Sequence, residues 1–585
     1  MFKFETDVLI IGSGPAGSAA AALLSAYGVR NVVVTKYNWL ANTPRAHITN
    51  QRAMEVFRDL GIEDEVNQKA VAQEWMGNNV FCTSLAGEEL GRLYSWGTHP
   101  NRMADYTLAS PTKICDIPQN LLEPILAHAG AIKGSRYRFD TEYIGLVQDN
   151  DGVTATVRDR LSADGGNSQV AKDIGLPFEG QMGVGGSMNI VCEMDLTKYV
   201  AHRPSVLYWV LQPGSNVGGI GMGLVRMVRP WNEWLIVWGY DINDGPPKVT
   251  DELAKDIVLK LVGDPNIPIK IKSTSTWTVN HCYATQVAKG RVFCMGDAIH
   301  RHPPSNGLGS NTSIQDAFNL AWKLAMVVKG QAGEDLLKSY DAERAPIAKQ
   351  IVERANKSIT EFGPIFQSLG LTDTTDPVVM RANMEKMKDH NAAAEQQREQ
   401  LREAILFKSY EFNCHGVEMN QRYTSIAVKS DGSAEPTYKR DKELYYEATT
   451  WPGARLPHVW IGNDNGHRIS TLDLAGKGEF TLFTGIGGEP WMKAAQEVSA
   501  QLNIPIRLVQ IGPGKKHTDL YGEWAAIREI KDSGCLLVRP DFHVAFRAKE
   551  VVGDPEAQLT EALTHLLSLN TKKIVQEKLH VSNSL

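Results

Sequence analysis

The segment Asp7-Val8-Leu9-Ile10-Ile11-Gly12-Ser13-Gly14-Pro15-Ala16-Gly17 stands near the start of the chain and decides the fold of the first domain. An apolar run leads into glycines spaced G-x-G-x-x-G, and the alanine-rich helix former Ser18–Leu24 follows. In a strand–turn–helix unit the first glycine permits the tight turn, the second lets a pyrophosphate approach the backbone, and the third lets the helix pack on the strand. Because the helix N-terminus also faces the phosphates, the pattern predicts a dinucleotide site made of Gly12, Gly14, Pro15, Ala16 and Gly17. A purely structural glycine turn is the alternative.

The second expected strand, Asn31–Val34, departs from the usual pattern at its end. An acidic residue in this place would hold the adenosine ribose, but the chain continues with Thr35 and Lys36. The Thr35 hydroxyl is able to hydrogen-bond a ribose hydroxyl. We therefore expect Thr35 and Lys36 at the adenosine end of the site.

The composition excludes several classes of protein. At 585 residues the chain exceeds what one hydrophobic core supports, so two or three domains are expected. A net charge of −6 gives no basic face for nucleic acid. Because it contains no run of about 18 apolar residues and no signal peptide, we expect a cytoplasmic protein without a membrane span. Seven cysteines without a C-x-x-C pair or metal-ligand spacing predict reduced thiols and no metal site.

A second glycine-rich element begins at Arg291–Ala298, where a short apolar strand ends in Gly296-Asp297. His302-Pro303-Pro304 and then Gly307-Leu308-Gly309-Ser310-Asn311 follow. Glycines in such a loop permit close approach of the backbone to a planar ring, and a helix beginning near Asn311 would aim its positive end at electron-rich ring oxygens. A generic glycine loop before a helix is the alternative.

The Gly-Asp pair and the loop after it resemble the second fingerprint of the flavoprotein aromatic hydroxylases. The resemblance implies that FAD is the cofactor and that Asp297 bonds the flavin ribityl chain. The loop residues that it implies along the isoalloxazine ring are Pro304, Gly307, Gly309, Ser310 and Asn311. Arg45 and Gln119 match the arginine and glutamine that these enzymes place near the flavin.

Those enzymes also carry an Asp-Gly motif between the two fingerprints, which Asp164-Gly165 matches. They lead into it through an apolar strand, whereas Val157–Ser162 is polar and short, so about ten residues are missing by comparison. A true deletion would remove a strand from the sheet. We therefore expect that the chain is incompletely represented at this point, with a true deletion as the alternative.

Within the flavoprotein hydroxylases the chain resembles the phenol hydroxylase group. The segments that carry the resemblance are 37–55, 115–119, 201–209 and 415–423. They are most similar to the 2,4-dichlorophenol 6-monooxygenase branch, with the 2-hydroxybiphenyl 3-monooxygenase branch as the alternative. The resemblance implies that NADPH or NADH reduces FAD, that O2 adds at the flavin C4a carbon as a hydroperoxide, and that a phenol, such as a chlorophenol, is hydroxylated ortho to its hydroxyl.

His47 is the candidate base that would turn the phenol into a phenolate. An ordinary histidine pKa near 6.5 suits proton removal around neutrality, and His47 lies two residues after Arg45. Asp116 is a second candidate that would accept or relay the proton. Arg226 and Arg229, on an expected strand, would steer the nicotinamide phosphate or a mobile flavin. For each of these four residues a structural or solvated side chain is the alternative.

The predicted fold class is α/β (α+β overall), with a Rossmann-like FAD-binding domain, an inserted β-sheet substrate domain and a C-terminal thioredoxin-like domain. The FAD-binding domain is expected at 1–75, 115–185 and 270–360, and the substrate domain at 76–114 and 186–269. Residues 361–451 are expected to form a helical linker region with a charged surface helix at 378–408. The thioredoxin-like domain, 452–585, has no C-x-x-C pair, so we expect subunit contact in a homo-oligomer, a dimer or tetramer, rather than redox chemistry.

Two other classes of flavoprotein would share these nucleotide motifs. One is a flavin dehydrogenase or reductase that inserts no oxygen. The other is a non-catalytic flavoprotein used for redox sensing. Oxygen uptake linked to a hydroxylated product separates both from a hydroxylase.

Overall fold

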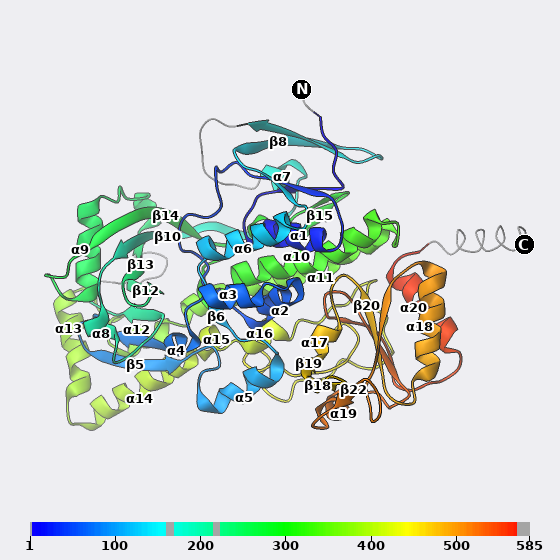
Figure 1. Ribbon diagram of the computed structural model, residues 1–585. Helices are drawn as coiled ribbons and strands as arrows, with labels where there is room; N and C mark the ends of the chain where they lie inside the picture. Colours follow the sequence, from blue (N-terminus) through cyan, green and yellow to red (C-terminus); the bar gives the residue numbers. More distant parts are fainter. Residues whose placement is uncertain (1–2, 160–168, 214–222, 570–585) are drawn as a thin grey trace, which may run out of the picture.

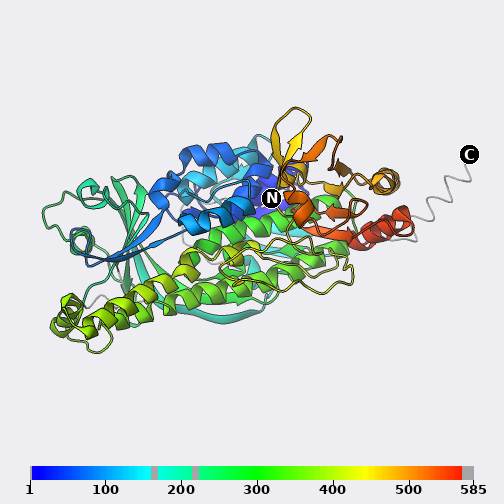
Figure 2. The same ribbon diagram turned by 90° about the horizontal axis from the view of Figure 1, so that it is seen from below.

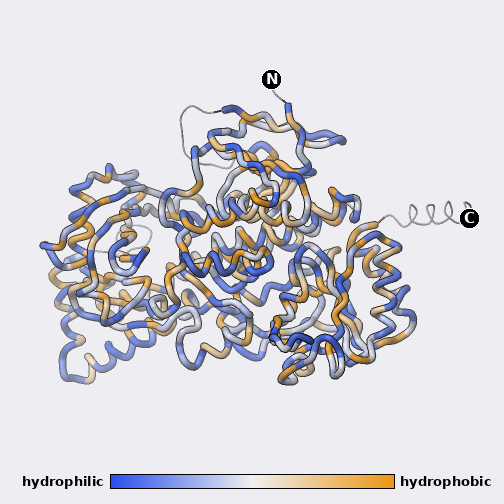
Figure 3. The backbone as a smooth tube through the Cα atoms, in the orientation of Figure 1, coloured by the Kyte–Doolittle hydropathy of each residue, from blue (hydrophilic) through white to orange (hydrophobic). Residues whose placement is uncertain are grey.

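The computed structural model describes residues 3–159, 169–213 and 223–569. Figure 1 shows a sheet domain at the left, the helices of the nucleotide domain in the centre and a smaller α/β domain at the right. Figure 2, turned by 90°, shows the long helices α10 (Leu308–Val328) and α11 (Lys338–Thr360) running between the two outer regions. Figure 3 shows apolar, orange stretches alternating with hydrophilic, blue stretches along the chain in all three regions.

The nucleotide domain is built on the predicted strand–turn–helix unit. Strand β1 (Val8–Ile11) leads into α1 (Pro15–Ala26), and β2 (Asn31–Val34) pairs with β1 in parallel register, Val8 opposite Asn31. Strand β7 (Arg136–Arg138) completes a three-stranded sheet of order β1-β2-β7. The four alanines 19–22 of α1 are buried because the helix packs against both α10 and α6 (Gln119–Ala131). These elements confirm the α/β prediction for the N-terminal segment.

The second edge of β1 is unpaired within the described residues. Ile11 is 39% exposed there. Residues 153–159, before the Asp-Gly motif, form β9 (Val153–Asp159), which pairs only with β8 (Thr141–Gln148) in a separate hairpin. Asp164 lies outside the described residues.

An eight-stranded sheet forms the second region. Its order is β17-β14-β10-β13-β12-β11-β4-β5. In that order the strands are His300–Arg301, Lys270–Ala284, Phe178–Glu193, Glu233–Tyr240, Gly223–Arg229, Leu207–Val210, Asn78–Cys82 and Glu89–Tyr94. Strand β10 runs through the predicted boundary between 185 and 186. Strand β14 begins at the predicted boundary, residue 270, and pairs with β10, so strands from both predicted domains lie in one sheet. The sheet is rich in β-branched and aromatic residues, which suit a half-buried pleated surface.

Three helices after residue 360 belong to this sheet rather than to a linker. They are α12 (Gly363–Ser368), α13 (Pro377–Glu385) and α14 (Ala392–Phe407). Met380, Met384, Leu401 and Ile405 are buried in the same core as the sheet. The single charged surface helix predicted at 378–408 is wrong in this respect, because the chain breaks after Lys388 and restarts with Asn391 as the N-cap of α14.

The C-terminal region has the predicted thioredoxin-like arrangement. Strands β20 (Phe480–Thr484) and β21 (Ile506–Gln510) run parallel, with α18 (Glu489–Leu502) between them in the chain. The antiparallel strands β23 (Cys535–Val538) and β24 (Val544–Ala548) follow, and α20 (Pro555–Leu566) packs beside α18. Phe318 of α10 contacts Phe542 at 5.3 Å between ring centroids, so this region shares a core with the nucleotide domain.

All seven cysteines are free and buried, as expected. Among the helices of the described residues, none is long and apolar enough to cross a membrane.

Candidate active site

Two of the predicted catalytic residues meet on a short strand pair at the junction of the two large regions. Strand β3 (Ile48–Thr49) pairs antiparallel with β6 (Cys115–Asp116), with Ile48 opposite Asp116. The backbone N–H of Ile117 donates to the His47 carbonyl at 2.8 Å. This register brings His47 and Asp116, 69 residues apart, to one point. Arg226 reaches the same point from β12 of the sheet.

His47, Asp116 and Arg226 form a buried base–acid–cation cluster. His47 Nδ1 lies 3.3 Å from Asp116 Oδ1, and the Arg226 guanidinium pairs with the other carboxylate oxygen. Burial alone would raise the pKa of Asp116, but Arg226 and His47 outweigh it and hold the pKa below its ordinary value. Burial, helped by the Arg226 charge, lowers the pKa of His47. A neutral His47 therefore donates Nδ1–H to the ionised Asp116 and presents a lone pair at Nε2.

Two polar atoms of the cluster are buried without a hydrogen-bond partner among the described residues. They are His47 Nε2 and Arg226 Nε. Leaving a buried polar group unsatisfied costs about 1–3 kcal/mol, so such atoms mark places where a ligand belongs. An acceptor lone pair beside a cationic donor fits a hydroxyl group that loses its proton.

The glycine turn after β1 fits a pyrophosphate. Gly12 has φ +102°, and a Cβ on Gly17 would lie 2.0 Å from the Gly12 carbonyl oxygen. A Cβ on Gly14 would meet only Glu123 Oε1, at 3.9 Å. Gly17 thus secures the helix against the turn, and Gly14 leaves open space above the backbone. Pro15 and Ala16 begin α1, whose first N–H groups face this space without intrahelical partners.

Thr35 and Lys36 follow β2 as predicted. Thr35 is buried, and its backbone N–H donates to the Arg138 carbonyl at 3.0 Å. Lys36 is half-buried, with its ammonium 5.4 Å from the Tyr37 ring centroid. Both residues lie at the end of β2, where the adenosine half of a dinucleotide would lie.

The glutamine at the start of α6 is linked to a residue that the sequence patterns missed. The Gln119 backbone N–H donates to the Arg45 carbonyl at 2.8 Å, and the Gln119 side-chain amide donates to Glu123 Oε1 at 2.5 Å. Glu123 also accepts from the backbone N–H of Ala41 at 2.6 Å. Burial raises the pKa of Glu123. Glu123 lies four residues after Gln119, one helical turn further along α6, and this spacing could have predicted that the two side chains meet.

The Gly296-Asp297 turn is hydrogen-bonded to helix α10 on one side, and the Asp297 side chain is exposed on the other. Gly296 has φ +62°, and its N–H donates to Asp316 Oδ2 at 3.0 Å. The Asp297 side chain is exposed. Pro304, Gly307, Gly309 and Ser310 form the loop and the first turn of α10. Asp316 was missed by the sequence patterns, because it lies in the helix interior with no glycine beside it.

Helix α10 begins at Leu308, three residues before the predicted start at Asn311. Gly307, with φ +65°, takes the turn before it. The Asn311 amide donates to the Ile48 carbonyl at 2.8 Å and accepts from the Asn50 N–H at 3.0 Å. Asn311 therefore connects the first turn of α10 to the segment directly after His47.

Arg226 and Arg229 lie in different surroundings in the structure. Arg226 is 8% exposed and ion-paired, which excludes a solvated strand charge at this position. Arg229 is half-buried and donates to the Lys69 carbonyl at 3.0 Å, outside the cluster.

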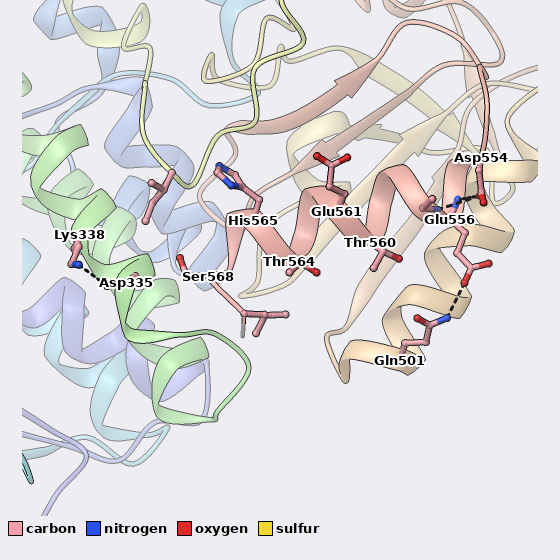
Figure 4. Close-up of a pocket in the computed structure, with 13 residues that line it drawn as sticks. Asp335, Lys338, Gln501, Asp554, Glu556, Thr560, Glu561, Thr564, His565 and Ser568 are labelled. Atoms are coloured by element: carbon pink, nitrogen blue, oxygen red, sulfur yellow. Dashed lines mark hydrogen bonds and ion pairs between the residues drawn. The ribbon is translucent and has the colours of Figure 1, made fainter. Parts of the chain in front are cut away.

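A surface groove of about 1080 Å³ lies elsewhere, along α20 in the C-terminal region (Figure 4). Its lining includes Asp335, Glu556 and His565. It contains none of the predicted site residues, so it plays no part in the chemistry described below.

The fold and the site together define a dinucleotide-binding α/β protein with a buried acid–base cluster between its nucleotide domain and a large sheet. A family model described as "FAD binding domain" matches residues 5–355, and one described as "Aromatic-ring hydroxylase, C-terminal" matches residues 449–568. The chain belongs to the FAD-binding aromatic-ring hydroxylases.

Individual proteins match the chain over nearly their full length. The chain is 55% identical to 2,4-dichlorophenol 6-monooxygenase of Cupriavidus pinatubonensis, with 97% of each chain covered. It is 49% identical to phenol 2-monooxygenase of Pseudomonas sp. strain EST1001, covering 96% of this chain and 92% of the other. Among solved structures, the flavin-dependent monooxygenase PieE in complex with FAD and substrate matches with a TM-score of 0.91 at 40% identity, covering 97% of this chain and 100% of that one.

Proposed function

We propose that the chain is an FAD-dependent monooxygenase that hydroxylates a phenol at the ring carbon ortho to its hydroxyl, with a chlorophenol as substrate. The overall reaction consumes phenol, NAD(P)H, a proton and O2, and yields a catechol, NAD(P)+ and water. The observation that carries the proposal is the unpaired, buried His47 Nε2 beside Asp116 and Arg226. The names of the relatives support the choice of substrate class.

We assign the FAD site to the two glycine turns. Gly12, Gly14 and Gly17 would hold the pyrophosphate, and the exposed Asp297 carboxylate would bind the ribityl hydroxyls. Bound FAD, reduced by NAD(P)H, supplies the activation of dioxygen. The remaining tasks fall to side chains of the chain itself.

His47 is the proposed general base. Its Nε2 would accept the phenolic proton, and Asp116 would stabilise the imidazolium that forms. Arg226 would stabilise the phenolate charge. Extra electron density on the ring favours attack by an electrophilic oxygen, and the burial of all three side chains excludes water from the charged intermediate.

Replacing His47 by Ala is expected to lower kcat/KM for hydroxylation by about 100-fold below the phenol's own pKa. Because the pKa of His47 lies below its ordinary 6.5, the wild-type residue stays neutral and able to accept a proton throughout the neutral range. The loss should therefore shrink as the pH approaches the phenol's pKa, and it should be smaller for more acidic phenols. Rates of product formation across pH, with two phenols of different acidity, measure this dependence.

The matched control is His128→Ala, which removes an exposed histidine of α6 and should leave the pH profile unchanged. A loss for His47→Ala that is equal at every pH would assign His47 to substrate positioning and would contradict its role as a base.

Product analysis tests the reaction itself. The holoenzyme is incubated with 2,4-dichlorophenol or 2-hydroxybiphenyl, NADPH and labelled dioxygen, and the products are identified by mass spectrometry. A singly labelled dichlorocatechol is the expected result, and a hydroxylated biphenyl alone would move the assignment to the neighbouring branch. NADPH consumption that yields only hydrogen peroxide from both phenols would overturn the hydroxylase proposal and favour a reductase.

We further propose that the protein acts as a cytoplasmic homo-oligomer, a dimer or tetramer. Light scattering of the full-length chain is the suitable test, because a monomer would contradict the proposal directly. Deleting the C-terminal region is an unsuitable test, because Phe480 of this region contacts Trp322 of α10 at 5.8 Å between ring centroids. Without the C-terminal region, the core that it shares with the nucleotide domain would be exposed.

A further inference from the structure

A turn of the C-terminal region reaches deep into the nucleotide domain. It comprises Arg539–His543, between β23 and β24, and all its polar side chains are buried. The Arg539 guanidinium forms a bidentate ion pair with Glu343 of α11, at 2.6 and 2.8 Å, and a second pair with Asp541, at 2.9 and 2.6 Å. Glu343 also accepts from Lys323 of α10 at 2.8 Å. The turn thus joins both long helices.

A second line of contacts leads from this turn to the flavin-side turn. The His543 ring stacks on the Tyr423 ring, with centroids 4.2 Å apart. The Tyr423 hydroxyl accepts from Arg344 Nη1 at 2.9 Å, and Arg344 Nε donates to Asp316 Oδ1 at 2.7 Å. Asp316 is the residue whose other oxygen accepts from the Gly296 N–H. Four consecutive contacts therefore connect the C-terminal region to Gly296.

The charged side chains along this path are buried, and their positive and negative charges are equal in number. Three cations face three carboxylates, and each is at most 2% exposed: Arg344, Arg539, Lys323, Asp316, Glu343 and Asp541. Buried ion pairs repay the cost of desolvation poorly, so an apolar interface would hold two domains together at least as well. What such a network supplies is a defined geometry, because its charged hydrogen bonds are directional. Some donors have two acceptors: Arg344 Nη1 donates both to the Tyr423 hydroxyl and to Gln421 Oε1, each at 2.9 Å.

We propose that the Arg539–His543 turn is a positioning element for the FAD-binding turn Gly296–Asp297, acting through Tyr423, Arg344 and Asp316. The C-terminal region then has a task for the cofactor site although it contributes no residue to it. The inference rests on the proposed assignment of Gly296–Asp297 to FAD.

Tyr423→Phe tests the path with the smallest change. The variant keeps the ring that stacks on His543 and removes only the hydroxyl that receives Arg344. We expect the dissociation constant for FAD, measured by flavin fluorescence on full-length apoprotein, to rise about five- to tenfold, with the melting temperature of the apoprotein little changed.

Tyr208→Phe is the matched control. Tyr208 is fully buried and its hydroxyl donates to the Arg203 carbonyl at 3.0 Å. It lies on β11, where its neighbour Leu207 is opposite Arg226, so Tyr208 points to the sheet face away from the cluster. Its FAD affinity should equal that of the wild type.

A second pair of variants separates positioning from general stability. His543→Ala removes the stacked ring and should weaken FAD binding, whereas His543→Phe keeps a ring in place and should restore it. Equal FAD affinity in Tyr423→Phe, His543→Ala and the wild type would overturn the inference, as would a loss of affinity that only follows the melting temperature.

Asp297→Ala distinguishes the two proposals. If it loses FAD while Tyr423→Phe and His543→Ala bind as the wild type does, the positioning role fails and the FAD site stands. If Asp297→Ala binds FAD with wild-type affinity, the assignment of Gly296–Asp297 to the FAD site is wrong, and the positioning role that rests on it is wrong as well.

Discussion

Asp116→Asn is expected to lower kcat/KM for hydroxylation by about 1000-fold, the largest effect of any single substitution in the cluster. The amide cannot stabilise a protonated His47, and it no longer selects the Nδ1–H form of the ring that leaves Nε2 free. It also leaves Arg226 without its counter-charge in a buried place, where an uncompensated ion costs about 3–5 kcal/mol. The loss should therefore exceed that of His47→Ala.

Steady-state rates of NADPH oxidation and of catechol formation measure the effect, together with the melting temperature of each variant. Asp195→Asn, which changes an exposed carboxylate of the sheet domain, serves as the control and should retain wild-type rates. A variant Asp116→Asn that folds and hydroxylates at more than a tenth of the wild-type rate would remove Asp116 from the proton path.

Gly17→Ala is expected to abolish measurable FAD binding and to destabilise the apoprotein as well. The added Cβ would lie 2.0 Å from the Gly12 carbonyl oxygen and 3.3 Å from an Ile10 methyl group. Because the closest atom belongs to the backbone, no side-chain rotation relieves the clash, and helix α1 or the turn must move. Overpacking in a close-packed core costs about 1–3 kcal/mol even where side chains can yield.

Gly14→Ala should separate cofactor binding from stability. Its Cβ would meet only Glu123 Oε1 at 3.9 Å, so the apoprotein should melt near the wild-type temperature while the methyl group occupies the space expected for the pyrophosphate. Titration of both variants with FAD, alongside thermal melts without it, gives the comparison. Wild-type FAD affinity in Gly14→Ala would show that the cofactor does not approach this turn.

The strand–turn–helix unit was predictable because its signal is local. Each glycine of the first fingerprint is required by the backbone geometry of the turn in which it lies, and the apolar run before the turn has the length of a buried strand. The same holds for the Gly296-Asp297 turn. The start of α10 was misplaced by three residues because Gly307 and Leu308 carry the real boundary, and helix ends are set by single backbone angles.

The buried cluster of His47, Asp116 and Arg226 was predictable only in parts. His47 and Asp116 were each identified, but their contact depends on the pairing of β3 with β6 across 69 residues. Arg226 was placed on a strand and given the task of steering a nucleotide, because no local pattern reveals which carboxylate a strand residue will face. Asp316 and Glu123 were missed for a related reason. Each accepts a hydrogen bond from the backbone of a turn or loop that is distant in the sequence, Gly296 for Asp316 and Ala41 for Glu123.

The open edge of β1 bears on how the protein behaves when it is concentrated or overproduced. In the part of the chain that the structure describes, this edge has unpaired N–H and C=O groups. With the uncharged sequence Val8–Ile11 and the exposed Ile11, it makes a template on which a strand of another molecule could add. Such growth has no natural end, and it leads to precipitate rather than to a defined assembly. Since a ligand of the folded state suppresses excursions from it, cells well supplied with flavin should yield more of the protein in solution.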